Sequence, residues 1–139
     1  MIESVGALIY STSTKRFLFL LRNGPKFSGT WGLPGGKVEA NETVSQALER
    51  EINEELSGVI RGAKLYPIEK FTSDNKKFTY HTFLIPVDEE FVPLLNNEHR
   101  GYAWCAVGDH PRPLHPGVWR TFSFAEVIEK LKTVQTLLG

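Results

Sequence analysis

The sequence predicts an α+β fold from two kinds of periodic pattern. Short apolar segments rich in β-branched and aromatic residues recur along the chain, and turn residues separate them. Two longer segments repeat their apolar residues at helical spacing, one in the middle of the chain and one at its C-terminal end. The 139 residues, 41% of them hydrophobic, suffice for one substantial core. We therefore expect a single domain over residues 1–139.

Two strands are expected near the N-terminus. Residues 4–10 are apolar and β-favouring, and the polar run at 11–15 ends them in a turn. Residues 17–21 are uninterruptedly apolar, as expected of a strand that is covered on both faces. A further short extended segment is expected within residues 27–33.

A glycine loop then leads into the first helix. Pro34-Gly35-Gly36 frees the backbone, because glycine permits positive φ angles and a close approach of the main chain to a ligand. Asn41 is expected as the N-cap of the helix, with Glu42 in a first turn that favours acidic residues. The helix should run to about Leu56, where Ser57-Gly58 supplies the stop.

The C-terminal half predicts three more strands, over residues 64–71, 77–87 and 102–107. A polar loop at 96–101 precedes the last of them. Three prolines exclude regular structure over residues 110–117, which we expect to form a surface connector or a lid.

The last segment predicts an amphipathic helix. Ser123 and Glu126 have the spacing of a capping box, which marks the start of a helix. The apolar residues that repeat at helical spacing after them are Val127, Ile128, Leu131, Val134 and Leu138.

Three glutamates on the first helix are in electrostatic conflict. Glu51 repels Glu54 and Glu55 at spacings i,i+3 and i,i+4, and all three lie near the helix end that favours cations. On a helical wheel Glu55 falls almost inside the apolar stripe, where a carboxylate must be paired, protonated or bound to a metal. A divalent cation such as Mg²⁺, which prefers oxygen ligands, would resolve these conflicts together. The alternative is a solvated acidic face with a surface ion pair between Arg50 and Glu54.

The composition excludes several classes of protein. Sixteen basic and sixteen acidic residues leave a formal net charge of zero, so broad attraction to nucleic acid or an anionic membrane is not expected. The N-terminus lacks the pattern of a signal peptide and no segment resembles a membrane span, so we expect a cytoplasmic protein. The single Cys105 excludes an internal disulfide framework.

Residues 36–58 resemble the signature of the Nudix hydrolases. That signature is a glycine, five residues, a glutamate, seven residues, then arginine-glutamate, an aliphatic residue, any residue, two glutamates, any residue, a glycine and an aliphatic residue. One departure is that Ser57-Gly58 stands where the family has its closing glycine and aliphatic residue. The residues that match at the required spacing are Gly36, Glu42, Arg50, Glu51, Ile52, Glu54 and Glu55.

The resemblance implies a fold, a reaction and a metal site. The implied fold is a Nudix-type α/β/α sandwich, in which a mixed β-sheet carries the signature loop and helix and a C-terminal helix. The implied reaction is Mg²⁺-dependent hydrolysis of a diphosphate linkage in a nucleoside di- or triphosphate or a nucleoside diphosphate derivative, with Mn²⁺ as a substitute ion. The implied metal ligands are Glu51, Glu54 and Glu55, with the Gly35 carbonyl as an additional one.

Other residues receive supporting roles by the same resemblance. Arg50 would orient a glutamate, while Gly36 and Glu42 would support the loop and hold it to the helix. The family's general base comes either from the signature helix or from a later loop. Glu98, in the polar loop before Tyr102, is the expected base or extra ligand, and a solvated glutamate is its alternative.

The substrate is less clearly indicated. A catalytically silent Nudix-fold module that binds a nucleotide is the alternative to an enzyme, and a structural domain with an acidic helix is a third reading. The expected partner is a small nucleotide, and the sequence leaves a homodimer open. Candidates to contact phosphates or to stack on a base are Arg22, Lys37, Lys70, Lys76, Lys77, Phe27, Tyr80 and Trp104.

Overall fold

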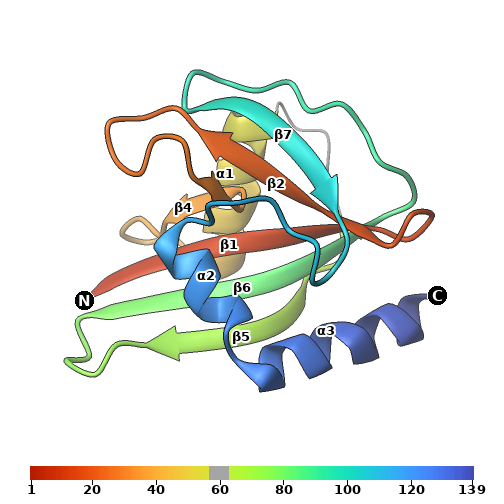
Figure 1. Ribbon diagram of the computed structural model, residues 1–139. Helices are drawn as coiled ribbons and strands as arrows, with labels where there is room; N and C mark the ends of the chain where they lie inside the picture. The colour runs from red at the N-terminus through yellow and green to blue at the C-terminus, as the bar shows by residue number, and fades with distance from the viewer. Residues whose placement is uncertain (57–62) are drawn as a thin grey trace.

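A computed structural model describes residues 1–56 and 63–139 (Figure 1). The expected helix stop at Ser57-Gly58 lies outside these residues. The strands are β1 (Ile2–Ser11), β2 (Arg16–Arg22), β3 (Trp31–Gly32), β4 (Gly35–Lys37), β5 (Tyr66–Thr72), β6 (Phe78–Val87) and β7 (His99–Cys105). The helices in the described part are α1 (Val44–Leu56), α2 (Pro116–Phe122) and α3 (Ala125–Leu138).

Strand β1 is the centre of a mixed sheet. It pairs in parallel with β6 along its whole length, and β5 pairs antiparallel with β6. The other edge of β1 is shared, since β4 pairs with residues 4–6 and β2 pairs only at Tyr10 and Ser11. Strand β2 then diverges to pair with β3 and β7. The glycine loop, as β4, and β2 therefore occupy different parts of the same edge of β1.

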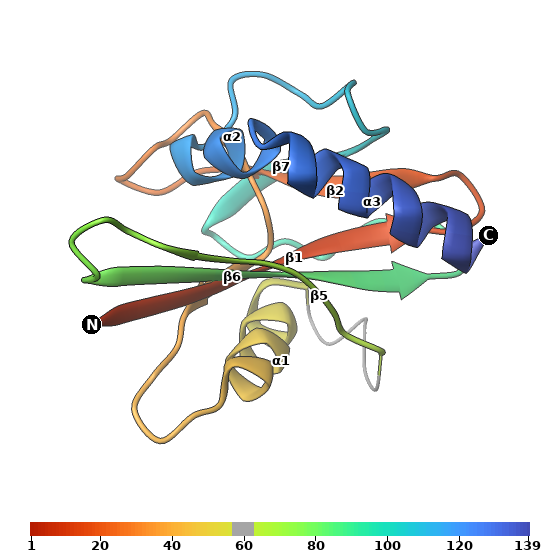
Figure 2. The ribbon, with the colours of Figure 1, turned by 90° about the horizontal axis from the view of Figure 1, so that it is seen from below.

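Helices cover both faces of this sheet. Figure 2 shows α1 on one side and α2 and α3 on the other. The alternation along β1 explains the two layers of core, because Ala7 and Ile9 belong to the cluster with α1, whereas Leu8 and Tyr10 belong to the cluster with α2 and α3. The predicted α/β/α sandwich with a mixed sheet is confirmed.

The start of α1 differs from the expectation. Asn41 is not the N-cap, because its backbone is in the left-handed region at φ 66° and the helix begins at Val44. The hydroxyl of Thr43 accepts from the Gln46 amide at 3.1 Å, and the Gln46 side chain accepts from the Thr43 amide at 2.9 Å. This reciprocal pair is a capping box. Glu42 consequently lies before the helix, free to bind other groups.

Two expectations for the C-terminal third are also wrong. Strand β7 begins at His99, three residues before the predicted start, because pairing with Arg22 draws the end of the polar loop into the sheet. Residues 110–117 are not wholly irregular, since Pro116 opens α2. Proline is tolerated in the first helical turn, where its missing N–H has no helical partner to lose.

The predicted terminal helix is present, with a different cap. Phe124 is the N-cap of α3 and makes no side-chain capping bond. Ser123 belongs to the end of α2 instead, where its hydroxyl donates to the Trp119 carbonyl at 2.7 Å. Within the described ranges, no helix is long and apolar enough to cross a membrane.

Candidate active site

The glycine loop approaches β1 more closely than any side chain would allow. Gly35 pairs with Gly6, and its backbone has a φ of 150°. A Cβ atom on Gly35 would lie 2.0 Å from the Val5 carbonyl oxygen. A Cβ on Gly36 would lie 2.4 Å from Oε1 of Glu51, on the side of α1. Gly35 therefore requires glycine, whereas a side chain at Gly36 would displace the end of the Glu51 side chain.

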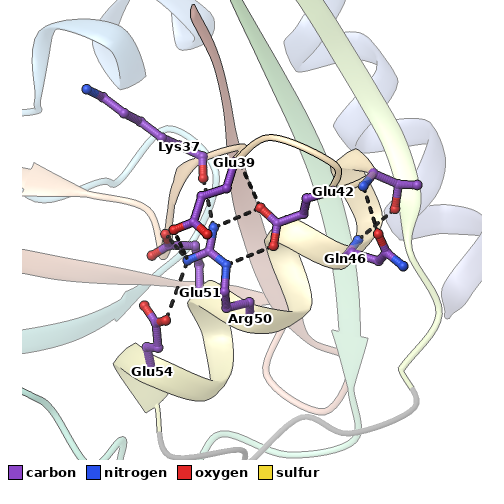
Figure 3. Close-up of polar contacts among 8 residues, drawn as sticks. Lys37, Glu39, Glu42, Gln46, Arg50, Glu51 and Glu54 are labelled. Atoms are coloured by element: carbon purple, nitrogen blue, oxygen red, sulfur yellow. Dashed lines mark hydrogen bonds and ion pairs between the residues drawn. The ribbon is translucent and has the colours of Figure 1, made fainter.

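Arg50 ties this loop to α1 (Figure 3). Its Nε and Nη2 donate to the two oxygens of Glu42 at 2.8 and 3.0 Å, its Nη2 donates to the Lys37 carbonyl at 2.9 Å, and its Nη1 donates to Glu51 at 2.9 Å. Hydrogen bonding from Arg50 lowers the pKa of Glu42 to about 2, and the Glu39 amide adds to that effect. The arrangement fixes Glu51 against the loop.

Glu55 is a buried carboxyl group behind the loop. The residue is 1% exposed, as its place in the apolar stripe predicted. The Gly35 amide donates to its Oε1 at 2.9 Å, while its Oε2 has no hydrogen-bond partner among the described residues. Burial is the largest cause of the rise in the pKa of Glu55 to about 9, and the charges of Glu51 and Glu98 contribute to the same rise. The metal-free site therefore holds Glu55 protonated near neutral pH.

His99 and Glu98 bring two more ligand atoms to Glu55. One ligand atom from each of the three residues lies within 4.8 Å of the others. His99 is 6% exposed, and its Nδ1 lies 3.6 Å from Glu55 Oε2. Within the part of the chain that the structure describes, neither of these two atoms has a hydrogen-bond partner. A cation between them would satisfy both.

The electrostatics of the cluster favour a cation site. Burial lowers the pKa of His99 to about 4, so the imidazole is neutral near pH 7 and available as a ligand. Glu98 is exposed and faces the cluster from the end of the polar loop. Sequence reasoning selected Glu98 but missed His99, because the strand was expected to begin at Tyr102. If the strand had been expected to begin directly after Glu98, His99 would have been placed next to the site.

The other predicted ligands lie beside this cluster and not within it. The Glu51 side chain is 13% exposed and bound to Arg50, and burial raises its pKa. The Glu54 side chain is 57% exposed, and its Oε1 lies 3.5 Å from Arg50 Nη1. Gly35 contacts the cluster through its amide. The structure therefore brings Glu55 and Glu98 together and places Glu51 and Glu54 along the adjoining edge of α1.

A cavity of about 460 Å³ begins at the glycine loop and extends to α2. None of the described residues that line it is acidic, while four of them, Arg22, Lys26, Lys37 and Arg120, carry a positive charge. A hollow of about 580 Å³ lies elsewhere and does not include the loop. The apolar and aromatic residues of the loop cavity are Ile2, Val5, Phe27, Leu33, Phe78, Tyr80 and Val118.

Some of the substrate-binding residues that the sequence suggested line the cavity, and others do not. It includes Arg22, Lys37, Phe27 and Tyr80, and it excludes Lys70, Lys76, Lys77 and Trp104. The Trp104 indole packs edge-on against Phe91 and donates to its carbonyl at 3.1 Å, which accounts for it as a core residue.

Comparison with known proteins agrees with this architecture. A family model described as the NUDIX domain matches residues 2–126. The chain belongs to the Nudix family. The matched region of this Nudix domain contains the glycine loop, α1, the cluster of Glu55, Glu98 and His99, and the cavity.

Curated relatives of the Nudix domain include proteins named for nucleotide hydrolysis. An 8-oxo-dGTP diphosphatase of Haemophilus influenzae is 32% identical over 85 residues, which are 61% of this chain and 62% of the relative. A nucleoside triphosphatase NudI of Escherichia coli is 32% identical over 93 residues, which are 60% of this chain and 66% of the relative. The chain thus spans less than two thirds of the length of these relatives.

Solved Nudix structures share the fold. A MutT Nudix hydrolase from Burkholderia pseudomallei superimposes with a TM-score of 0.65 at 27% identity, covering 89% of this chain and 97% of that one. The Escherichia coli protein ORF135 gives a TM-score of 0.67 at 26% identity, covering 96% of this chain and 92% of that one.

Proposed function

We propose that this Nudix domain is a Mg²⁺-dependent pyrophosphohydrolase that cleaves a diphosphate linkage in a nucleoside triphosphate or a nucleoside diphosphate derivative. The observation that carries the proposal is the position of Glu55. This buried carboxyl group forms a cluster with Glu98 and His99, in which Glu55 Oε2 and His99 Nδ1 have no hydrogen-bond partner among the described residues. It also accepts a hydrogen bond from the glycine loop, which borders a cationic cavity. The names of the relatives support the same reaction class.

The cavity supplies the groups that would bind a nucleotide. Arg22, Lys26 and Lys37 lie on its walls near the loop and would pair with phosphate oxygens. Phe27 is 49% exposed and packs edge-on against His115, with ring centroids 4.6 Å apart. Its free surface would stack on the base.

The carboxylates would hold the metal. Glu55 and His99 would bind it directly, and Glu51, Glu54 and the Gly35 carbonyl would complete the site. Mg²⁺ suits the oxygen ligands, and Mn²⁺ is the expected substitute. When bound, the ion would neutralise phosphate charge and lower the pKa of a water molecule.

The remaining residues would prepare the site for hydrolysis. Glu98 is exposed at the mouth of the cluster, where it would accept a proton from the attacking water. Arg50 would keep Glu51 in position, and Glu42 would hold Arg50 through its bidentate pair. Gly36 would leave the space that Glu51 occupies. Glu55 would lose its proton when the site is filled.

Three wider expectations accompany the proposal. We propose that residues 1–139 fold as a single domain, that the protein acts in the cytoplasm, and that its partners are small nucleotides and not nucleic acids. The formal net charge of zero supports the last point.

A substrate panel assayed with Mg²⁺ tests the proposal. It should contain canonical and oxidised nucleoside triphosphates, ADP-ribose, dinucleoside polyphosphates and nucleotide sugars. We expect turnover of at least one class, with Glu55→Gln reducing it by orders of magnitude while the protein stays folded. Tight binding without turnover across the panel would favour a silent binding module instead.

A further inference from the structure

Asn96 joins the loop that carries Glu98 to the helix that carries Glu55. Its Nδ2 donates to the Glu54 carbonyl oxygen at 3.1 Å, in the last described turn of α1. Its Oδ1 accepts from the Glu98 amide at 3.0 Å, which closes an Asx turn. The Asn96 side chain therefore bridges two segments that lie 42 residues apart in the sequence, and each segment supplies a carboxyl group to the cluster.

The chemistry of this bridge requires an amide side chain. One partner of Asn96 is an N–H donor and the other is a carbonyl acceptor, so the side chain between them must accept and donate at once. An aspartate of the same shape would still accept from the Glu98 amide. It would place a carboxylate oxygen against the Glu54 carbonyl, where two acceptors would repel one another.

The strand that follows does not hold Glu98 by itself. Strand β7 begins at His99, and its register with the end of β2 is shifted there, as in a β-bulge. Glu98 thus lies before the regular ladder, and its side chain is exposed. Its backbone is held on one side by the Asn23 amide, which donates to the Glu98 carbonyl at 2.8 Å, and on the other by Asn96. The direction of the Glu98 carboxylate therefore depends on these contacts.

We propose that Asn96 is a positioning residue that holds Glu98 at a fixed distance from Glu55. A general base must lie within hydrogen-bond reach of the attacking water, and a displacement of about 1 Å can cost roughly a hundredfold in rate. Asn96 does not line the cavity, so it acts on kcat through Glu98 and not through substrate binding. The inference rests on the proposed function, because it takes Glu98 as the general base.

The test compares Asn96→Asp with Asn97→Asp, which adds the same charge at the next residue. Asn97 is exposed, and its contact with Asn23 uses the backbone carbonyl. We expect Asn96→Asp to lower kcat about tenfold with KM near the wild-type value, while Asn97→Asp keeps kcat within about twofold. Asn96→Ala removes both bonds without adding a charge and should lower kcat at least as far, so a folding defect of the aspartate variant would not hide the effect.

A double-variant cycle separates positioning from a general effect on the fold. In a Glu98→Gln background, neither substitution of Asn96 should lower kcat further, because the base that Asn96 positions is already absent. Losses that multiply in the double variants would overturn the inference. A normal kcat in folded Asn96→Asp and Asn96→Ala would overturn it as well.

Nuclear magnetic resonance relaxation of the Glu98 amide provides a readout that needs no substrate. Its order parameter should fall from about 0.85, the value of a rigid backbone, toward about 0.6 in Asn96→Ala, and it should stay unchanged in Asn97→Asp. An unchanged order parameter in Asn96→Ala would overturn the inference. Loss of order at Glu98 in a protein that hydrolyses no nucleotide would contradict the proposed function and still support Asn96 as the residue that holds Glu98.

Discussion

The stability of the metal-free protein should fall as the pH rises above 6.5, because Glu55 stays protonated in the folded state. The ordinary pKa of a glutamate is 4.5, and burial raises that of Glu55 to about 9. Between these values the unfolded chain has lost the proton and the folded chain retains it. The free energy of unfolding should then decrease by about 1.4 kcal/mol per pH unit.

His99 determines the pH window for this experiment. Its pKa falls from 6.5 to about 4 on folding, so its effect has the opposite sign and makes the protein more stable as the pH rises between those values. Burial also lowers the pKa of His115, which acts in the same direction as His99. The histidine effects oppose that of Glu55 below pH 6.5, and above it the Glu55 effect is the largest. The expected loss from there to about pH 8.5 is therefore roughly 3 kcal/mol.

Urea unfolding in a chelating buffer at several pH values measures this slope. Glu55→Gln replaces the carboxyl group with a neutral group of similar shape and should remove most of the slope. Glu54→Gln, on the exposed side of the same helical turn, should preserve it and is the matched control. A stability independent of pH above 6.5, or an unchanged slope in Glu55→Gln, would refute the assignment of a buried protonated carboxyl group.

Four other substitutions probe three separate parts of the site. Gly35→Ala should destabilise the fold by roughly 3 kcal/mol or more, because the new Cβ would clash with the Val5 backbone. Gly36→Ala should cost less stability, because its Cβ would mainly displace the Glu51 side chain. Equal urea midpoints for the two variants would contradict this difference. His99→Leu should weaken Mn²⁺ binding about tenfold in an electron paramagnetic resonance titration, with His110→Gln as a control away from the cluster; unchanged affinity would remove His99 from the site. Arg50→Lys loses the bidentate pair with Glu42 and should lower kcat about tenfold. KM should stay near the wild-type value, because Arg50 does not line the cavity. A change confined to KM would show that Arg50 contacts substrate.

The sequence predicted the layers of the fold well, because the hydrophobic periods of β1 and α1 reflect burial directly. The position of Glu55 in the apolar stripe anticipated its burial for the same reason. Helix ends were harder to predict. Asn41 and Thr43 are both good capping residues, and the choice between them depends on Arg50, which binds Glu42 outside the helix.

The parts of the site that sequence reasoning missed depend on contacts between distant segments. His99 joins Glu55 only because β7 pairs with β2 at Arg22. Arg120 reaches the cavity because a proline-rich segment turns into α2 and packs over β5 and β6. Neither contact has a local pattern, since each pair is brought together by the sheet and not by spacing along the chain.

Hydrolysis at the Glu55 cluster is tested most directly by ³¹P nuclear magnetic resonance of a nucleoside triphosphate incubated with the protein and Mg²⁺. We expect pyrophosphate and a nucleoside monophosphate as products, no turnover with a chelator, and near-complete loss of turnover in folded Glu55→Gln. Turnover that persists without a divalent ion, or that is normal in Glu55→Gln, would contradict the assignment of this cluster as the hydrolytic centre.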